Sequence, residues 1–264
     1  MSKKTKISLS DKYQKKSHRE HILQLPDTYI GSVEHNECIS WSFNETDTKL
    51  IPENMIIIPG LYKIFDEILV NAYDQHVRKY QLWGLNKCTT NDLVRNIKVC
   101  INKELGEISV YNDGEGIDIA LHPEHNIYIP ELIFGNLLTS TNYDQDEEKI
   151  TGGKNGYGAK LTNIFSKKFT IETTDTERKK KFIQVYYNNM TDKDEPLITT
   201  YTGDSYTKNT FIPDFERFGI SNLNDSIYSI MKKRVYDISA CTDQTVSVFF
   251  NDVKIPFKNF EKYI

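Results

Sequence analysis

The sequence predicts an α+β fold in two layers, one of helices and one of strands, and three observations support this prediction. A long segment from Gly60 to about Tyr80 carries apolar residues at helical spacing. Two short segments, 97–101 and 107–111, are strand-like and are separated by a turn around Gly106. Several more strand-like segments follow in the second half of the chain. A sheet covered by helices is therefore expected.

The N-terminal end of the chain differs in composition from the remaining sequence. Residues 1–20 are polar and basic, and we expect them to form an arm outside the folded core. From His21 the stretch HILQL is helix-like, and the next residues, PDTYIG, contain a proline and a glycine that interrupt the chain. The folded core is therefore expected to begin at His21.

The long helix carries an apolar stripe with a polar ridge beside it. The stripe consists of Leu61, Ile64, Phe65, Ile68, Leu69 and Ala72. At about 100° per residue, four polar residues fall within an arc of about 60°, namely Glu67, Asn71, Asp74 and Arg78. The ridge is either a solvated face with i,i+4 pairs or part of a site. ATP hydrolysis needs a group that activates water and an oxygen ligand for Mg²⁺, and Glu67 and Asn71 have suitable chemistry.

Two glycine-containing segments are further candidates. The sequence NDGEG at 112–116 follows the second strand of the predicted hairpin and is either a tight turn or a binding loop. After a predicted helix at 129–138 and a polar loop, TSTNYDQDEE, comes GGKNGYGAK at 152–160, which leads into the helix-like LTNIF. This segment is either a flexible surface loop or a phosphate-binding loop, whose backbone N–H groups face an anion. It matches neither a Walker A loop nor a dinucleotide fingerprint.

The rest of the chain predicts more of the sheet and one more helix. Strand-like segments occur at 168–173, 182–187, 210–212 and 245–250, and a helix-like segment at 223–236. The basic run ERKKK at 177–181 either contacts DNA phosphates or is a solvated hairpin tip.

Composition excludes several classes of protein. The 264 residues carry a formal net charge of -4, so the chain has no global basic field for nucleic acid. No signal peptide or membrane-spanning stretch is apparent. The four cysteines are scattered without zinc-site spacing and are expected to be reduced thiols of an intracellular protein: Cys38, Cys88, Cys100 and Cys241.

The order of the three candidate segments resembles the GHKL (Bergerat) ATPase fold of gyrase, an ATP-driven chaperone class, histidine kinases and mismatch-repair proteins. Within that superfamily, several words resemble the ATPase domain of eukaryotic and viral DNA topoisomerase II, a type IIA enzyme. They are YQKKSHREHILQLPDTYIGSVE, KIFDEILVNAYD, IFGNLLTSTNYD, TGGKNGYGAKL, FIPDFERF and KKRVYDIS. The resemblance covers nearly the whole chain.

The resemblance implies a mixed, mainly antiparallel sheet with helices on one face. It also implies three parts: an arm or strap at 1–20, the ATP-binding domain at 21–250, and the start of a truncated transducer domain at 251–264. The implied function is Mg-ATP binding and hydrolysis that drives dimer closure and DNA strand passage in the full-length enzyme. Because the family's γ-phosphate lysine lies in the transducer, this chain is expected to bind ATP better than it hydrolyses it. Its location would be the nucleus in a eukaryote, or the host cytoplasm or virion for a virus.

Roles for single residues follow from the same resemblance. Glu67 would be the general base and Asn71 the Mg²⁺ ligand, while Asn112 would read the adenine amino group. The other nucleotide-binding candidates are Tyr13 of the strap, Asp74, Arg78, Ser140, Thr141, Asn142, Lys154, Asn155, Gly156, Tyr157, Gly158, Ala159, Lys160 and Thr210. Arg78 could instead form a structural salt bridge with Asp74.

Three alternatives compete with this interpretation. A histidine kinase would need a phosphoacceptor hairpin, and none fits before His21. An ATP-sensing or chaperone-like module would not explain the words PDTYIG and TGGKNGYGAKL. A purely structural role for the glycines and carboxylates predicts no affinity for nucleotides.

Overall fold

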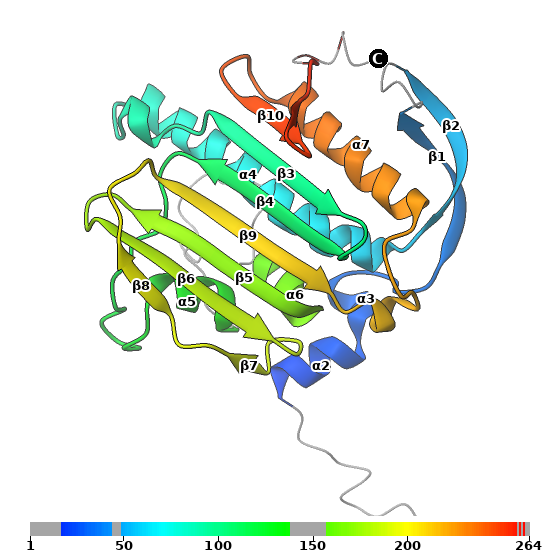
Figure 1. Ribbon diagram of the computed structural model, residues 1–264, viewed down its shortest axis with the longest axis horizontal. Coiled ribbons are helices and arrows are strands. Elements are labelled where there is room, and N and C mark those ends of the chain that lie inside the picture. The colour runs from blue at the N-terminus through cyan, green and yellow to red at the C-terminus, as the bar shows by residue number, and fades with distance from the viewer. Residues whose placement is uncertain (1–16, 44–48, 138–156, 258, 260, 262–264) are drawn as a thin grey trace, which may run out of the picture.

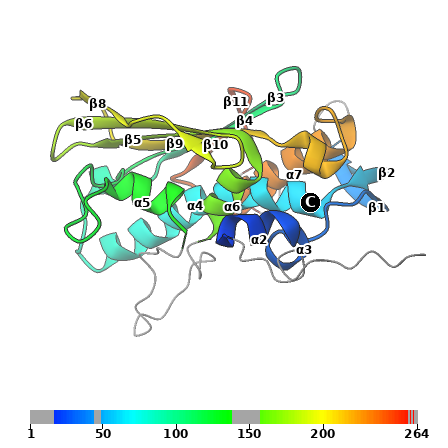
Figure 2. The same ribbon diagram turned by 90° about the horizontal axis from the view of Figure 1, so that it is seen from below.

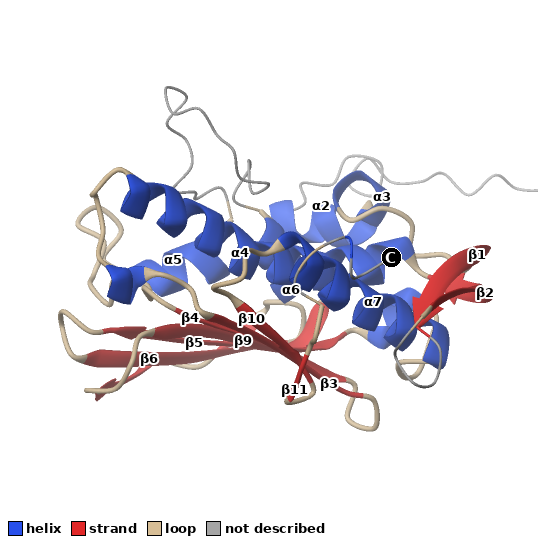
Figure 3. Ribbon diagram, turned by 90° about the horizontal axis from the view of Figure 1, so that it is seen from above, coloured by secondary structure: helices blue, strands red, loops and turns tan. Residues whose placement is uncertain are grey.

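The computed structural model describes residues 17–43, 49–137, 157–257, 259 and 261. One layer is a nine-stranded sheet in the order β11-β10-β3-β4-β9-β5-β6-β7, with β8 paired to β6. The helices α2, α4, α5, α6 and α7 lie on one face of this sheet, as Figure 3 shows. The expected two-layer α+β fold is confirmed, and the opposite face of the sheet carries none of the described helices.

The sheet is mainly antiparallel. Its strands are β3 (Asn96–Asn102), β4 (Glu107–Asp113), β5 (Ser166–Asp175), β6 (Lys180–Tyr187), β7 (Asp192–Lys193), β8 (Leu197–Thr200), β9 (Tyr206–Pro213), β10 (Ser247–Phe250) and β11 (Val253–Lys254). In the described chain, β10 pairs with β3 in parallel and the other pairs are antiparallel. The predicted hairpin is the pair β3–β4 at the middle of the sheet (Figure 1).

The helical layer is built around one long helix. The helices are α2 (His18–Gln24), α3 (Pro26–Tyr29), α4 (Pro59–Gly84), α5 (Ile129–Gly135), α6 (Gly158–Ile164) and α7 (Asp225–Cys241), with 3₁₀ turns at Thr90–Asp92 and Phe215–Phe218. The helix predicted at 60–80 is confirmed as α4 and continues to Gly84. Figure 2 shows α2 and α3 beside α4 and α6.

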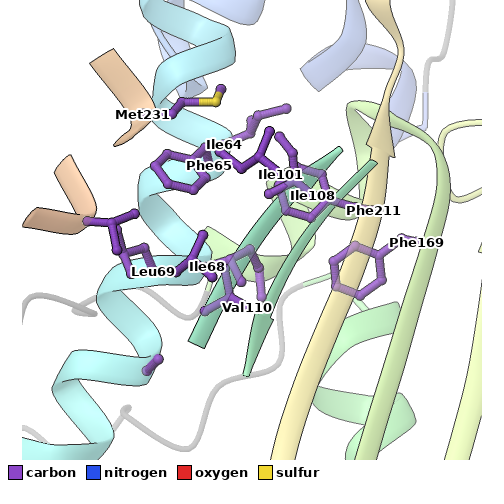
Figure 4. Packing of buried hydrophobic residues seen from close by; sticks show 14 of the residues in the cluster. Ile64, Phe65, Ile68, Leu69, Ile101, Ile108, Val110, Phe169, Phe211 and Met231 are labelled. Carbon is purple, nitrogen blue, oxygen red and sulfur yellow. The ribbon is translucent and has the colours of Figure 1, made fainter. Parts of the chain in front are cut away.

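The core lies between α4 and the sheet. The predicted apolar stripe of α4 is buried, and it packs with Ile101, Ile108, Val110, Phe169 and Phe211 from the strands and with Met231 from α7 (Figure 4). Burial of each such side chain stabilises the fold by about 1.5–3 kcal/mol. This packing fixes the position of the polar ridge beside the stripe.

Two features differ from the sequence-based expectation. Helix α2 begins at His18, before the expected start at His21, because Ser17 and Glu20 form a capping box. A two-stranded sheet of β1 (Asn36–Phe43) and β2 (Leu50–Ile57), which was not expected, packs beside α7 (Figure 1). At the other end of the chain, β11 extends the main sheet next to β10. The division into domains stays a prediction.

Candidate active site

The polar ridge of α4 is brought against the N-terminal end of α6. The Glu67 side chain is 21% exposed and forms an ion pair with Lys63, one turn earlier. A Cβ atom added to Gly158, the first residue of α6, would overlap Oε2 of Glu67. The Oγ1 hydroxyl of Thr162 donates to the Ile64 carbonyl at 2.8 Å and ties the two helices together. The close contact therefore requires glycine at 158.

Lys160 is a buried lysine two residues after Gly158. It lies in the first turn of α6 and is only 1% exposed. Burial lowers the pKa of its ammonium group to about 8, from an ordinary value of 10.5. Because an opposite charge favours the charged form of a titratable group, an anion bound beside Lys160 would favour the protonated lysine. The adjacent Ala159 is also buried, and the Tyr157 ring contacts His18 of α2 edge-on at 5.9 Å.

The NDGEG segment forms the other end of the site. Asn112 is the penultimate residue of β4 and is 7% exposed. Its Nδ2 donates to the Asp113 carbonyl at 3.0 Å, so its Oδ1 is the atom with which it can accept a hydrogen bond. The Asp113 carboxylate instead accepts from the N–H groups of Arg95 and Asn96, at 2.7 and 2.8 Å. Asp113 thus has a structural role, and Oδ1 of Asn112 is the acceptor that a ligand could use.

The glycines of this segment make a tight turn. Gly114 has φ +88°, in the left-handed region that favours glycine, and a Cβ at Gly116 would overlap the Thr174 carbonyl oxygen. Helix α4 holds the turn in place, because Gln75 Nε2 donates to the Glu115 carbonyl at 3.1 Å and Lys79 forms an ion pair with the Glu115 carboxylate. The turn interpretation and the site interpretation are therefore compatible.

One helix thus contacts both ends of the candidate site. Glu67 meets α6, whereas Gln75 meets the 112–116 turn. Eight residues of helix span about 12 Å at 1.5 Å per residue. Asn71 and Asp74 lie between the two contacts and are half-buried. Arg78 is exposed, and its guanidinium donates to Oε1 of Gln75 at 2.5 Å.

Comparison with known proteins finds similar sequences and similar solved structures. No family model matches the chain. The chain is 51% identical to DNA topoisomerase 2 of Acanthamoeba polyphaga mimivirus over 267 residues, which cover 100% of this chain and 20% of that protein. It is 49% identical to the solved ATPase region of Saccharomyces cerevisiae topoisomerase II, with a TM-score of 0.89 over 97% of this chain and 65% of that one. The chain is homologous to the N-terminal ATPase region of type II DNA topoisomerases.

A more distant structure supports the fold alone. The 43K ATPase domain of Thermus thermophilus gyrase B is 20% identical, with a TM-score of 0.59 over 90% of this chain and 50% of that one. The expected GHKL-type fold is confirmed by these likenesses. The chain spans about a fifth of the length of the mimivirus topoisomerase.

Within this fold, Thr210 is not where the sequence suggested. It lies in the interior of β9, not at its start. Asn209 and Phe211 on either side of it are buried toward the helices, so Thr210 points to the opposite face of the sheet. Thr207 is paired with Asn112 and lies on the helix-facing side, where its Oγ1 is 2.9 Å from that of Thr173. The register of β4 and β9 therefore places Thr207, and not Thr210, beside Asn112, the candidate for reading the base.

The other candidates lie outside the described residues. They are Tyr13, Ser140, Thr141, Asn142, Lys154, Asn155 and Gly156. In the described ranges, no group of three or more His, Cys, Asp or Glu residues is arranged to hold a metal ion. The same ranges contain no helix with the length and apolar character of a membrane span.

Proposed function

We propose that this chain binds ATP with Mg²⁺ along α4, with the triphosphate near α6 and the base at the 112–116 turn. The contact between Glu67 and Gly158, next to the buried Lys160, carries the proposal. It combines a carboxylate, a close backbone approach and a cation, which together suit a phosphate chain and an attacking water. The likeness to solved topoisomerase II ATPase regions supports the same assignment.

Each end of α4 has a distinct role in the proposal. Glu67 accepts a proton from the attacking water, and the neighbouring Lys63 orients its carboxylate. Asn71, one turn further on, offers an amide oxygen to Mg²⁺, which when bound would neutralise charge on the phosphates. Lys160 balances the negative charge of the phosphates.

At the base end, Asn112 accepts a hydrogen bond from the exocyclic amino group of adenine. The orientation of its amide, fixed by the bond to the Asp113 carbonyl, supports this role. Thr207 lies opposite Asn112 and adds a hydroxyl to the same end. Asp74 and Arg78 line the ridge between the two ends. The remaining roles, for the strap residue Tyr13 and the 140–142 and 154–156 segments, rest on the family resemblance.

For the full-length protein we propose an ATP-driven type IIA topoisomerase that passes one DNA duplex through another. ATP binding would close a homodimer gate. The relatives named DNA topoisomerase 2, from a virus and from eukaryotes, support this proposal and an intracellular location, nuclear or viral according to the source.

The test is calorimetric titration of the chain with a non-hydrolysable ATP analogue, with and without Mg²⁺. We expect binding that Asn71→Ala weakens only in the presence of Mg²⁺, and light scattering should detect dimers at saturation. No binding by the folded wild-type chain would overturn the proposed function.

A second variant separates binding from turnover. The assay uses the full-length protein, in which ATP turnover can be measured. There, Glu67→Gln is expected to leave the affinity for the analogue nearly unchanged, because the amide keeps the shape of the carboxylate. Turnover should fall by about 100-fold or more, because the amide cannot accept the proton of water. Equal losses of affinity and turnover would contradict the role of general base.

A further inference from the structure

Asn209 is a buried amide in an apolar part of the sheet. It lies in the interior of β9 and is 7% exposed. Its neighbours in the adjacent strands are Val110 in β4 and Ile171 in β5, which are 2% and 0% exposed. Phe211, two residues further along the same face, is also buried. Packing at this position would favour an aliphatic side chain.

The amide oxygen of Asn209 lacks a hydrogen-bond donor. Its Oδ1 is buried, and no donor reaches it from the residues that the structure describes. An unpaired buried acceptor destabilises the fold, whereas an apolar residue of similar size would not. A buried acceptor at this position therefore indicates that its hydrogen-bond donor belongs to a bound ligand.

The register of the sheet places this acceptor next to the base end of the site. Asn112 is paired with Thr207, and Asn209 is two residues from Thr207 on the same face. In an antiparallel pair such diagonal neighbours are about 7–8 Å apart. Both amides can therefore reach the same edge of a bound base, each by a direct hydrogen bond or through one bridging water.

We propose that Asn209 is a second base-reading amide, which accepts a hydrogen bond from the exocyclic amino group of adenine directly or through one water. The inference rests on the proposed function, since it requires the base to lie at the 112–116 turn. With acceptors from both Asn112 and Asn209, this edge of the site favours an amino group. A guanine base presents a carbonyl oxygen there, so it would meet two acceptors without a donor.

The experiment compares the 264-residue chain with its Asn209→Val variant. Each is titrated by calorimetry with non-hydrolysable analogues of ATP and GTP and with the corresponding purine triphosphate that lacks the amino group. Thermal unfolding is measured without nucleotide. The control is Thr170→Val, which makes a similar exchange on the strand next to β9 but on the opposite face of the sheet.

Asn209→Val is expected to bind the ATP analogue roughly three- to tenfold more weakly, the range of one neutral hydrogen bond. Binding of the purine analogue should be unchanged, and the preference for ATP over GTP should narrow. The melting temperature should stay the same or rise, because an unpaired polar atom is removed. Thr170→Val should bind all three analogues as the wild type does.

Three results would overturn the inference. An unchanged preference for adenine would show that Asn209 does not read the base. An equal loss for all three analogues, or a lower melting temperature without nucleotide, would assign Asn209 a structural role. If the wild-type chain binds none of the analogues, the proposed function itself fails, and this outcome is distinct from the first three.

Discussion

At the scale of single residues, we expect the charge of Lys160 to link nucleotide binding to pH. Burial lowers the pKa of its ammonium group to about 8 in the free protein. Above pH 8 the free protein loses this positive charge, so binding of a triphosphate must first restore the proton. We expect the affinity for a non-hydrolysable ATP analogue to fall as pH rises from 7 to 9.5, by up to about tenfold per pH unit above 8.

A charge-neutral variant tests this origin of the pH dependence. Lys160→Met should bind more weakly at pH 7 and should show little further loss up to pH 9.5 in calorimetric titrations. Lys168→Met, at an exposed position of β5, serves as the control and should keep the wild-type profile. A wild-type affinity that is constant across this range would contradict the role of Lys160.

At the scale of elements, the contact between the Glu67 carboxylate of α4 and the start of α6 depends on Gly158. Gly158 is the first residue of α6, and the atom that a new Cβ would meet is the far end of the flexible Glu67 side chain, so Gly158→Ala should not unfold the chain. The new Cβ would, however, displace the Glu67 carboxylate. We expect an unchanged or slightly higher melting temperature together with a loss of ATP turnover of about 100-fold.

Gly84→Ala is the matched control, since a Cβ at the end of α4 has no neighbouring atom within 4 Å. It should leave turnover unchanged in the same assay. If Gly158→Ala retained full turnover, the contact between Glu67 and α6 would have no part in positioning the carboxylate.

We expect the C-terminal half of α4 to be sensitive to acid through His76. Its Nε2 lies 3.1 Å from Oδ2 of Asp243. Burial lowers the pKa of His76 below 6.5, although Asp243 opposes the shift; Arg95 contributes to the lowering. The unfolded chain therefore takes up this proton at a higher pH than the folded chain. The contribution of neutral His76 to the free energy of unfolding is fully present above pH 6.5. This contribution should be lost as pH falls through the folded-state pKa, by at most about 1.4 kcal/mol per pH unit.

Thermal unfolding at pH 7.5 and 5.5 checks this expectation. His76→Phe, which keeps an aromatic ring between Tyr73 and Tyr80, should lose less stability on acidification than the wild type. The same loss in both proteins would assign the acid sensitivity to other groups.

The elements that the sequence predicted well are those with local signals. The stripe of α4 and the turn at Gly106 depend on neighbours within a few residues, and both were confirmed. The pair β1–β2 was missed because its burial is inverted. The sequence at 39–43 alternates apolar and polar residues, but Ile39 and Trp41 are exposed whereas Ser42 is buried. The exchange of Thr210 for Thr207 and the position of Asn209 depend on strand register, which joins segments about 100 residues apart.

At the scale of the whole molecule, the candidate site joins segments from four separate parts of the chain: α4, the 112–116 turn, α6 and β9. A nucleotide bound across them should therefore stabilise the fold as a unit. At 100 times its dissociation constant a ligand adds about 2.7 kcal/mol, which raises the melting temperature by roughly 5–10 °C for a chain of this size. Thermal unfolding with Mg²⁺ and the ATP analogue measures this shift.

Hydrogen exchange can then locate the effect within the molecule. Amide exchange should slow most in α6 and in the 112–116 turn, where local opening exposes groups that the nucleotide would contact. The pair β1–β2 packs on α7 at one end of the helical layer (Figure 3) and serves as an internal control. Slowing that is confined to β1–β2, or absent from both α6 and the turn, would place the nucleotide elsewhere and contradict the assignment of α4 as the helix that joins base and phosphates.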